Sequence, residues 1–385
     1  MFLRPYPNAS RLLTLAALGL AIPLLAGPAA AQRAPLDVDF LFNYYDQDGD
    51  NSPVTGGIGT EEQQVIAPVV VLRWAASEQW TLSATFGVDN ISSASTDNID
   101  TEVSSASEQD NRGHTYLTAS RLLGKNTWTV GAGFSTEYDY KSFSGSLGWS
   151  RDFNDRNTTL SAGLKHYQDT VDLYDIDGIL QGEDDRTTTE VSFAWTQILG
   201  PRTVFGSEIS FTSQSGFLST PFHEVILVDG RRVAERLPDS RSRLAVGLNL
   251  NHAFSKKIVQ RTNYRFYDDD FGITAHTIES ETHFRLPTET ALWLFPILRF
   301  HTQTASDYFG LPGVFTESAP YFTADRDLSE FTSEKFGMGF RWTRGLQPAR
   351  GFFGRLRGFE SRIASYSRED GLDALSVSLA LSWRF

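Results

Sequence analysis

The carboxyl end of the chain has the sequence LDALSVSLALSWRF, residues 372–385, in which large apolar and small polar side chains alternate. The apolar positions share one parity and are Leu375, Val377, Leu379, Leu381, Trp383 and Phe385. Successive side chains of a β-strand point to opposite faces, so this segment has one apolar face and one polar face. The pattern predicts a strand that separates hydrocarbon from water.

The amino end predicts a secretory signal. Arg4 and Arg11 precede an apolar run, residues 12–25, which small residues follow. A basic region, an apolar region and a small-residue cleavage site in this order are typical of a signal peptide. We therefore expect residues 1–31 to be removed and residues 32–385 to form one mature domain. The chain has no cysteine, which excludes disulfides, thiolate metal sites and a lipid on an N-terminal Cys.

The mature chain contains no stretch of the ~20 apolar residues that a membrane-spanning helix needs. Within hydrocarbon every backbone N–H and C=O needs an internal partner, which only helices and closed barrels provide. The sequence therefore predicts an all-β fold, a closed antiparallel transmembrane β-barrel of about 16 strands, with about 14 as the alternative. The expected strands are 37–46, 61–75, 79–91, 113–123, 127–138, 141–153, 158–168, 187–199, 203–213, 241–254, 258–269, 272–286, 290–302, 332–345, 355–368 and 372–385.

The breaks between these strands are alternately short and long, as in bacterial outer-membrane barrels. The long breaks are 47–60, 92–112, 169–186, 214–240 and 303–331. An even number of strands places both termini on one side of the membrane. We expect that side to be the periplasm, with the long loops outside the cell.

The acidic composition bears on partners. The chain has 34 Lys and Arg against 47 Asp and Glu, a formal net charge of −13, which argues against nucleic acid. We expect contact with outer-membrane lipid and lipopolysaccharide, whose phosphates acidic loops would reach through Ca²⁺ or Mg²⁺. Asp46, Asp48 and Asp50 resemble the start of a calcium loop, although Gly57 stands where such a loop has Glu. The alternative is a solvated acidic turn.

Several motifs resemble a known family. The segment YRFYDDDFGITAHT, residues 264–277, is similar to the central motif of domain-of-unknown-function family 3570 (DUF3570), and STEYDY at 135–140 matches as well. The resemblance implies a bacterial outer-membrane barrel and no particular activity. The final residues Leu381, Trp383 and Phe385 resemble the signal that the barrel-assembly machinery reads, so this machinery is an expected partner.

The two-residue period puts charged side chains on the inner face of three successive expected strands. These residues are Arg261, Arg265, Glu279, Glu281, His283, Arg285, Arg299 and His301. Facing charges on antiparallel neighbours attract strongly in a partly dry lumen. The arrangement predicts a constriction or solute-binding ring that selects by charge. The alternative is an ion-pair network that fills and stiffens the lumen.

A second group lies at the outer end of an expected strand, where Asp268, Asp269 and Asp270 precede His276. Clustered carboxylates with an imidazole predict a divalent-cation site, or a carboxylate that orients the His as a base at the barrel rim. The alternative is an acidic hairpin whose hydrogen bonds set the turn. We expect no other cofactor.

Three functional hypotheses follow. The leading one is a porin-like or solute-selective channel with a charged lumen. The second is a non-conducting barrel that serves as a structural or docking element for periplasmic or surface partners. The third, a rim-sited outer-membrane hydrolase, rests only on Asp269, Asp270 and His276, and the sequence lacks the Gly-x-Ser-x-Gly spacing of a Ser hydrolase. An enzyme is therefore the least favoured class.

Overall fold

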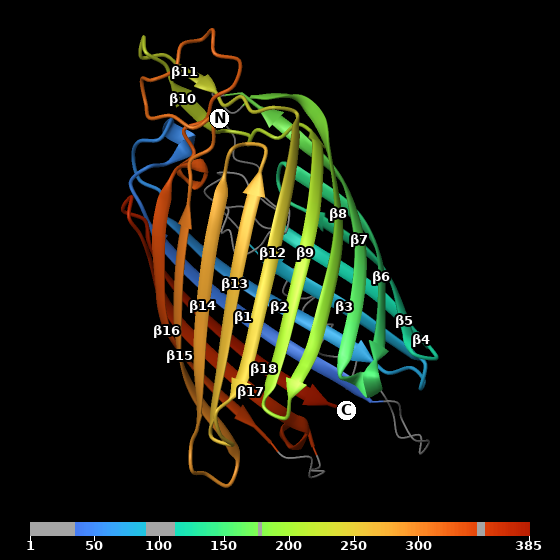
Figure 1. Cartoon of the computed structure of the whole chain (residues 1–385). Helices are drawn as coiled ribbons and strands as arrows, with labels where there is room; N and C mark the ends of the chain where they lie inside the picture. Colours follow the sequence, from blue (N-terminus) through green and yellow to red (C-terminus); the bar gives the residue numbers. More distant parts are fainter. Residues whose placement is uncertain (1–34, 90–111, 176–178, 345–350) are drawn as a thin grey trace.

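The protein is a closed antiparallel β-barrel of sixteen strands (Figure 1). The structure, a computed structural model, describes residues 35–89, 112–175, 179–344 and 351–385, so the expected signal segment lies outside it. The barrel strands are β1 (Leu36–Asp48), β2 (Gln63–Trp74), β3 (Trp80–Asp89), β4 (Arg112–Leu123), β5 (Asn126–Thr136), β6 (Tyr140–Phe153), β7 (Thr158–Tyr174), β8 (Leu180–Gly200), β9 (Thr203–Gly216), β12 (Ser240–Ala253), β13 (Ile258–Asp269), β14 (Thr274–Arg285), β15 (Ala291–Gln303), β16 (Phe331–Thr343), β17 (Leu356–Arg368) and β18 (Asp373–Arg384). The expected fold class is confirmed.

The first and last strands close the sheet. β1 pairs with β18 over twelve aligned residue pairs, beginning with Asp37 opposite Arg384. The backbone N–H of Leu36 donates to the carbonyl of Phe385 at 3.1 Å, and the N–H of Phe385 donates back at 2.8 Å. Arg384 also donates to both carboxylate oxygens of Asp37, at 2.6 and 2.9 Å. The sheet therefore has no free edge at its seam.

The two ends of the barrel differ. Leu36 and Phe385 lie at one end, which we call the turn end. Its connections are short apart from 344–355, which contains the 3-10 helix Phe353–Arg355; the short ones are 75–79, 124–125, 154–157, 201–202, 254–257 and 286–290. The other end, called the loop end here, carries the longer connections 49–62, 217–239 and 304–330. Of the expected long breaks, 47–60, 214–240 and 303–331 are long connections at this end, and 92–112 lies almost wholly outside the described residues.

The segment expected to be a loop at 169–186 is mostly strand, and that expectation was wrong. β7 continues to Tyr174 and β8 begins at Leu180. The register pairs Asp169 with Arg186, whose side chains form an ion pair at 3.6 Å. Because antiparallel pairing satisfies the backbone and brings these opposite charges together, the ladder extends well beyond the expected strand ends.

The outer face of the barrel is apolar. Phe143, Leu147 and Phe193 are between 56% and 63% exposed, which in a soluble protein would be unusual for such large side chains. Parity places them on the face that points away from the lumen. No helix in the described part of the chain is long and apolar enough to cross a membrane.

The inner face is different in its two halves. On β3 to β6 most inward side chains are small and carry hydroxyl groups, with Tyr116 and His114 as larger exceptions; the small ones include Thr81, Ser83, Thr85, Thr118, Ser120, Thr129, Ser142, Ser144 and Ser146. Hydrogen bonds between Ser120 and Thr129 (2.8 Å) and between Tyr116 and Ser146 (2.5 Å) confirm that these residues share one face. On β13 to β17, across the ring in the strand order, the inward side chains are largely charged.

The longest connection at the turn end covers the last residues of the chain. The ring of Phe352 lies 5.3 Å from that of Trp383 and 6.5 Å from that of Phe385. The guanidinium of Arg355 stands 5.0 Å from the ring of Phe385. Trp383 is in consequence only 7% exposed, although its parity is that of the outer face.

We expect Trp383→Ala to lower the stability of the barrel by about 3 kcal/mol, because truncating a well-packed Trp leaves a cavity. The measurement is the temperature at which the unboiled, compact form of the protein is lost on a gel. Trp128→Ala is the control, since Trp128 is 53% exposed. Equal losses in the two variants would contradict a structural role for the contact with Phe352.

Candidate functional site

The charged half of the lumen is the candidate site. Six inward side chains from β13, β14, β16 and β17 make up what we call the belt: Arg261, Glu281, His283, Arg341, Glu360 and Arg362. Alternation within each strand turns these residues to the same side of the sheet, and the register sets them side by side. The belt therefore joins strands that are far apart in the sequence.

Five of the six belt side chains, all except Arg261, are joined by a continuous series of ion pairs. His283 Nε2 lies 2.8 Å from Glu281 Oε2, and Arg362 Nη1 donates to Glu281 Oε1 at 2.5 Å. Arg362 Nε also donates to Glu360 Oε1 at 2.8 Å, and Arg341 pairs with the other oxygen of Glu360. Two carboxylates are thus shared among three cationic or protonatable side chains. Such sharing offsets the cost of placing these charges in a partly dry lumen.

An aromatic side chain supports the belt from β15. Phe295 is fully buried, and the ring of His283 stacks on it with centroids 4.1 Å apart. The guanidinium groups of Arg362 and Arg341 stand 5.1 and 5.8 Å from the same ring. A Cβ at Gly339 on the neighbouring strand would collide with the Phe295 ring. The glycine therefore leaves the space in which the ring, and with it the belt, is fixed.

The remaining expected lumen residues fall in three places. Arg265 and Glu279 line a cavity of about 400 Å³ on the lumen side of the wall. Arg299 and His301 are buried, 8% and 1% exposed, and His301 lies further toward the loop end. Arg285 is exposed near the turn end. The eight residues therefore share the inner face but do not form one ring.

Three members of the belt were missed by the sequence analysis. Arg341, Glu360 and Arg362 lie on strands that were correctly expected, and the two-residue period turns all three inward. Applying that period to these strands would have found them. The period could not have shown that Arg362 pairs with Glu281, because β17 and β14 are not neighbours in the sheet.

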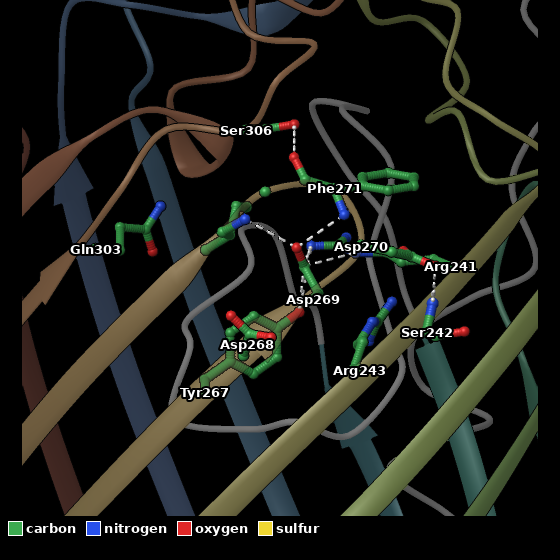
Figure 2. A network of polar contacts seen from close by, with 12 residues as sticks. Arg241, Ser242, Arg243, Tyr267, Asp268, Asp269, Asp270, Phe271, Gln303 and Ser306 are labelled. Atoms are coloured by element: carbon green, nitrogen blue, oxygen red, sulfur yellow. Dashed lines mark hydrogen bonds and ion pairs between the residues drawn. The ribbon is translucent and has the colours of Figure 1, made fainter.

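Asp269 holds the β13–β14 hairpin at the loop end. Figure 2 shows its carboxylate enclosed by donors, and its side chain is completely buried. Arg241 donates to Oδ2 from Nε at 3.0 Å, and the hydroxyl of Tyr267 donates to the same oxygen at 2.6 Å. The backbone N–H groups of Phe271 and Ile273 donate to Oδ1 at 3.0 and 2.9 Å. These contacts fit the alternative hypothesis to a cation or catalytic site, namely an acidic hairpin whose hydrogen bonds set the turn.

The structure does not bring the acidic triplet and His276 together. His276 is exposed, opposite Phe266 on β13, and its Nδ1 lies 2.8 Å from the Tyr264 hydroxyl, whereas Asp269 is buried on the inner face. Asp270 accepts from a backbone N–H of β12 at 2.9 Å (Figure 2), and Asp268 is exposed. The sheet therefore separates the imidazole from Asp269, and Asp268, on the same outer face as His276, accepts instead from the Thr274 hydroxyl at 2.9 Å.

Asp46 and Asp48 project from the outer face of β1. Together with Glu62 and Asp373 they line an external groove of about 700 Å³ near the loop end. Asp50 lies exposed in the connection that follows β1. In the described part of the chain, no group of three or more His, Asp or Glu side chains is arranged to hold a metal ion. The alternating carboxylates are thus spread along a surface and do not converge.

A cap stands on the loop end. We define it as residues 217–239, which contain β10 (Glu224–Ile226) and β11 (Arg232–Ala234), and residues 304–330. Figure 1 shows β10 and β11 beyond the rim of the barrel. The two segments share a small core, composed of Val225, Leu227, Phe322 and Ala324. The expected plain loop at 214–240 therefore contains a β-hairpin with its own buried side chains.

The cap is fixed to the wall of the barrel. Gln303 at the end of β15 donates from Nε2 to the carbonyls of Asp327 and Ser329, at 2.9 and 2.7 Å. Arg368 at the end of β17 donates to Asp327 at 2.5 Å and to Asp370 at 2.6 Å. Its attachment to two separate strands positions the cap on the charged half of the barrel.

Titratable groups are buried between the cap and the rim. His223 Nδ1 lies 3.8 Å from both Glu235 and Asp325. Burial alone would lower the pKa of His223, but the neighbouring carboxylates of Glu235 and Asp325 raise it above its ordinary value. Burial and the charge of Asp327 raise the pKa of Asp325 to about 6, and the same two causes raise the pKa of Glu61 to about 8.

The family model for proteins of unknown function named DUF3570 matches residues 10–369. The chain belongs to the DUF3570 family. No curated protein matches the sequence. The block at residues 264–277 that carried the resemblance is, in this DUF3570 protein, the β13–β14 hairpin that Asp269 holds.

Solved structures of outer-membrane proteins resemble this DUF3570 protein in fold. A bacterial polysaccharide outer membrane secretin is 11% identical with a TM-score of 0.51, and the match covers 93% of this chain and 100% of that chain. CdiB from Acinetobacter baumannii is 8% identical with a TM-score of 0.50, covering 90% and 60%. The outer membrane protein opdK from Pseudomonas aeruginosa is 9% identical with a TM-score of 0.44, covering 92% and 99%. The likeness to the first two structures is one of fold, and a closed barrel with an apolar outer face is consistent with an outer-membrane location.

The belt predicts that Glu281→Ala destabilises the barrel by about 1–3 kcal/mol, because His283 and Arg362 lose a shared charged acceptor. Thermal loss of the compact form in detergent measures the effect. Glu334→Ala is the matched control, since Glu334 is exposed and its parity is that of the outer face. A loss no larger than that of the control would show that the ion pairs do not stabilise the wall.

The buried groups also predict a pH dependence of the cap. His223, Asp325 and Glu61 all have raised pKa values in the folded protein, so the folded state holds their protons more tightly than the unfolded state. Their contribution to stability is complete below the unfolded-state pKa of each group and is lost as pH rises through the folded-state value. We therefore expect the cap to open more readily at about pH 8.5 than at about pH 5.

Hydrogen exchange of peptides from 217–239 and 304–330, corrected for intrinsic rates, measures this opening, with the 286–290 turn as internal reference. Glu61→Gln should reduce the pH dependence above about pH 6, since burial and the charge of Asp327 raise the pKa of Glu61 to about 8. Protection that is independent of pH, or that increases with pH, would contradict the assignment.

Proposed function

We propose that this protein is a porin-like, solute-selective channel of the bacterial outer membrane. In this proposal the turn end, where Leu36 and Phe385 lie, faces the periplasm and the loop end faces the outside. The charged wall on β13 to β17 interacts with the passing solute. The fold by itself does not distinguish a channel from a structural barrel, so the proposal rests on the lining of the lumen.

The observation that carries the proposal is the contrast between the two faces of one sheet. The outer face is apolar, while the inner face has a charged half and, across the ring, a half of small hydroxyl side chains. Small residues on one half leave space, and sixteen strands are enough to enclose an aqueous path. A barrel that only had to be stable could fill its lumen with apolar side chains instead.

The outer surface supports proposed partners. Asp46, Asp48, Glu62 and Asp373 gather carboxylates at one groove on the outer face near the loop end. In the orientation proposed above, this groove lies at the level of lipopolysaccharide phosphates, and Ca²⁺ or Mg²⁺ would bridge the two sets of negative charge. We propose that the barrel-assembly machinery reads Leu381 and Trp383 of β18 together with Phe385, which follows it.

A second candidate function has its own support. Inward side chains near the loop end are deeply buried: Thr188, Thr212 and Gln214 are at most 4% exposed. The cap adds an ordered surface above them, with a hydrophobic core of its own. A barrel closed at this end, which offers the cap to a surface partner, is a non-conducting docking element.

Conductance in a planar lipid bilayer separates the two candidates. A channel gives discrete current steps, and a salt gradient then gives a reversal potential that reports anion against cation preference. A unit charge about 7 Å from a passing ion in water changes its energy by about 0.6 kcal/mol, close to RT. We therefore expect Arg265→Gln to shift the permeability ratio about two- to threefold toward cations, and Glu279→Gln to shift it similarly toward anions.

Glu334→Gln serves as the control, because it removes the same charge from the outer face. Absence of current steps in the wild-type protein rejects the channel and favours the docking element. If all three variants give current steps with the same ion selectivity, the protein is a channel, but the charged wall does not set its selectivity.

A further inference from the structure

One carboxylate of the lumen stands apart from the ion pairs of the wall. Glu208 lies on the inner face of β9, and the residues opposite it on the neighbouring strands are Ala194 and Gly247. Neither neighbour offers a polar side chain. Within the described part of the chain Glu208 takes part in no hydrogen bond or ion pair, and it is exposed to the lumen. Glu208 is therefore a lumen carboxylate without a partner in the described part of the chain.

The space beside Glu208 is empty because of a glycine. A Cβ at Gly247 would meet no heavy atom within 4 Å. On the far side of Gly247 the register places Arg265, so Glu208, Gly247 and Arg265 form one row across three strands. Alternate strands are about 10 Å apart, twice the usual strand spacing. A carboxylate and a guanidinium therefore flank a gap without a side chain, and they make no ion pair with each other.

This gap belongs to the cavity of about 400 Å³, which has the size of a small-molecule site. Asn249 and Asn263, both exposed, line the cavity from the next row toward the turn end. Their amide groups can both donate and accept hydrogen bonds. On the side toward β7, Lys165 and Glu190 are paired with each other at 3.7 Å. The lining offers both signs of charge together with neutral polar groups.

We propose that this cavity is a binding site for a small zwitterion, an α-amino acid, in transit through the lumen. The ammonium group of the solute binds Glu208, and its carboxylate binds Arg265 across the space at Gly247. The amides of Asn249 and Asn263 take the remaining polar atoms. The transport role rests on the proposed channel, whereas the binding itself does not.

The charges around the cavity favour a zwitterion over a simple ion. A simple anion would be attracted by Arg265 but repelled by Glu208 and Glu279, which both line the cavity. A simple cation would be attracted by Glu208 and Glu279. It would be repelled by Arg265 and Lys165, which also line the cavity. Only a solute with both charges is attracted at both ends of the gap. Charge-assisted hydrogen bonds at each end would then orient it along the row.

Binding to the purified full-length protein in detergent tests the site, by NMR titration with three probes of nearly equal size. L-Alanine carries both charges, L-lactate lacks the ammonium group and L-alaninol lacks the carboxylate. We expect alanine to bind about tenfold more tightly than either analogue, a difference of about 1.4 kcal/mol. Glu208→Gln should remove the advantage of alanine over lactate. Arg265→Gln should remove its advantage over alaninol.

Two further variants complete the test. Gly247→Leu fills the gap and should weaken alanine binding about tenfold or more with both charges in place. Glu334→Gln, on the outer face, should leave all three affinities unchanged. Each variant is first checked for the compact form of the folded barrel. Equal affinity of the wild type for the three probes, or equal loss for alanine and lactate in Glu208→Gln, overturns the site.

The site and the channel can fail separately. If the protein gives current steps in the bilayer but does not bind alanine more tightly than its analogues, the channel is supported and the zwitterion site is rejected. Preference for alanine in detergent without current steps would support the site in a closed barrel and reject the channel. In a conducting protein, alanine should also reduce the ionic current, and Gly247→Leu should abolish that reduction.

Discussion

The requirement that every backbone N–H and C=O in hydrocarbon find an internal partner governs this structure. β1 meets it by pairing with β18, two strands from opposite ends of the chain. Once the ring is closed, the two-residue period decides the direction of every side chain in the wall. An apolar exterior and a polar interior then follow from the same alternation. The lumen, the belt and the cap all depend on that closure.

Closure creates a second problem, which is the placement of charge inside a narrow space. In the belt, Glu281 and Glu360 are each shared by two neighbours, and Phe295 gives the cationic side chains an aromatic surface. At the loop end, the charges of Arg241 and Asp269 compensate each other in a buried ion pair, and Asp269 also sets a turn. Glu208 is different, since it faces a gap without a partner. Paired charges stabilise the wall, whereas the unpaired carboxylate of Glu208 remains available to a solute.

Much of the fold could be predicted from the sequence, because barrel strands carry their own signal. The period of two located all sixteen strands, and it turned Arg261, Arg265 and Glu281 to the correct face. It failed at residues 169–186, where polar residues on both faces hid a strand extension that the pairing of Asp169 with Arg186 supports. Closeness in sequence is a weaker guide to the acidic clusters than the two-residue period is to the strands. Asp269 and His276 are close in sequence but face opposite sides of the wall.

The sequence by itself determined the barrel and which residues face its lumen, because alternation is a local property of each strand; it left sixteen or fourteen strands open, and the closed ring has sixteen. Only the tertiary structure decided which of those residues meet. Arg362 reaches Glu281 across two intervening strands, and Glu208 faces Arg265 over Gly247, through curvature and register that no single strand encodes. Local side-chain direction follows from the backbone, whereas contact between distant strands requires the closed ring.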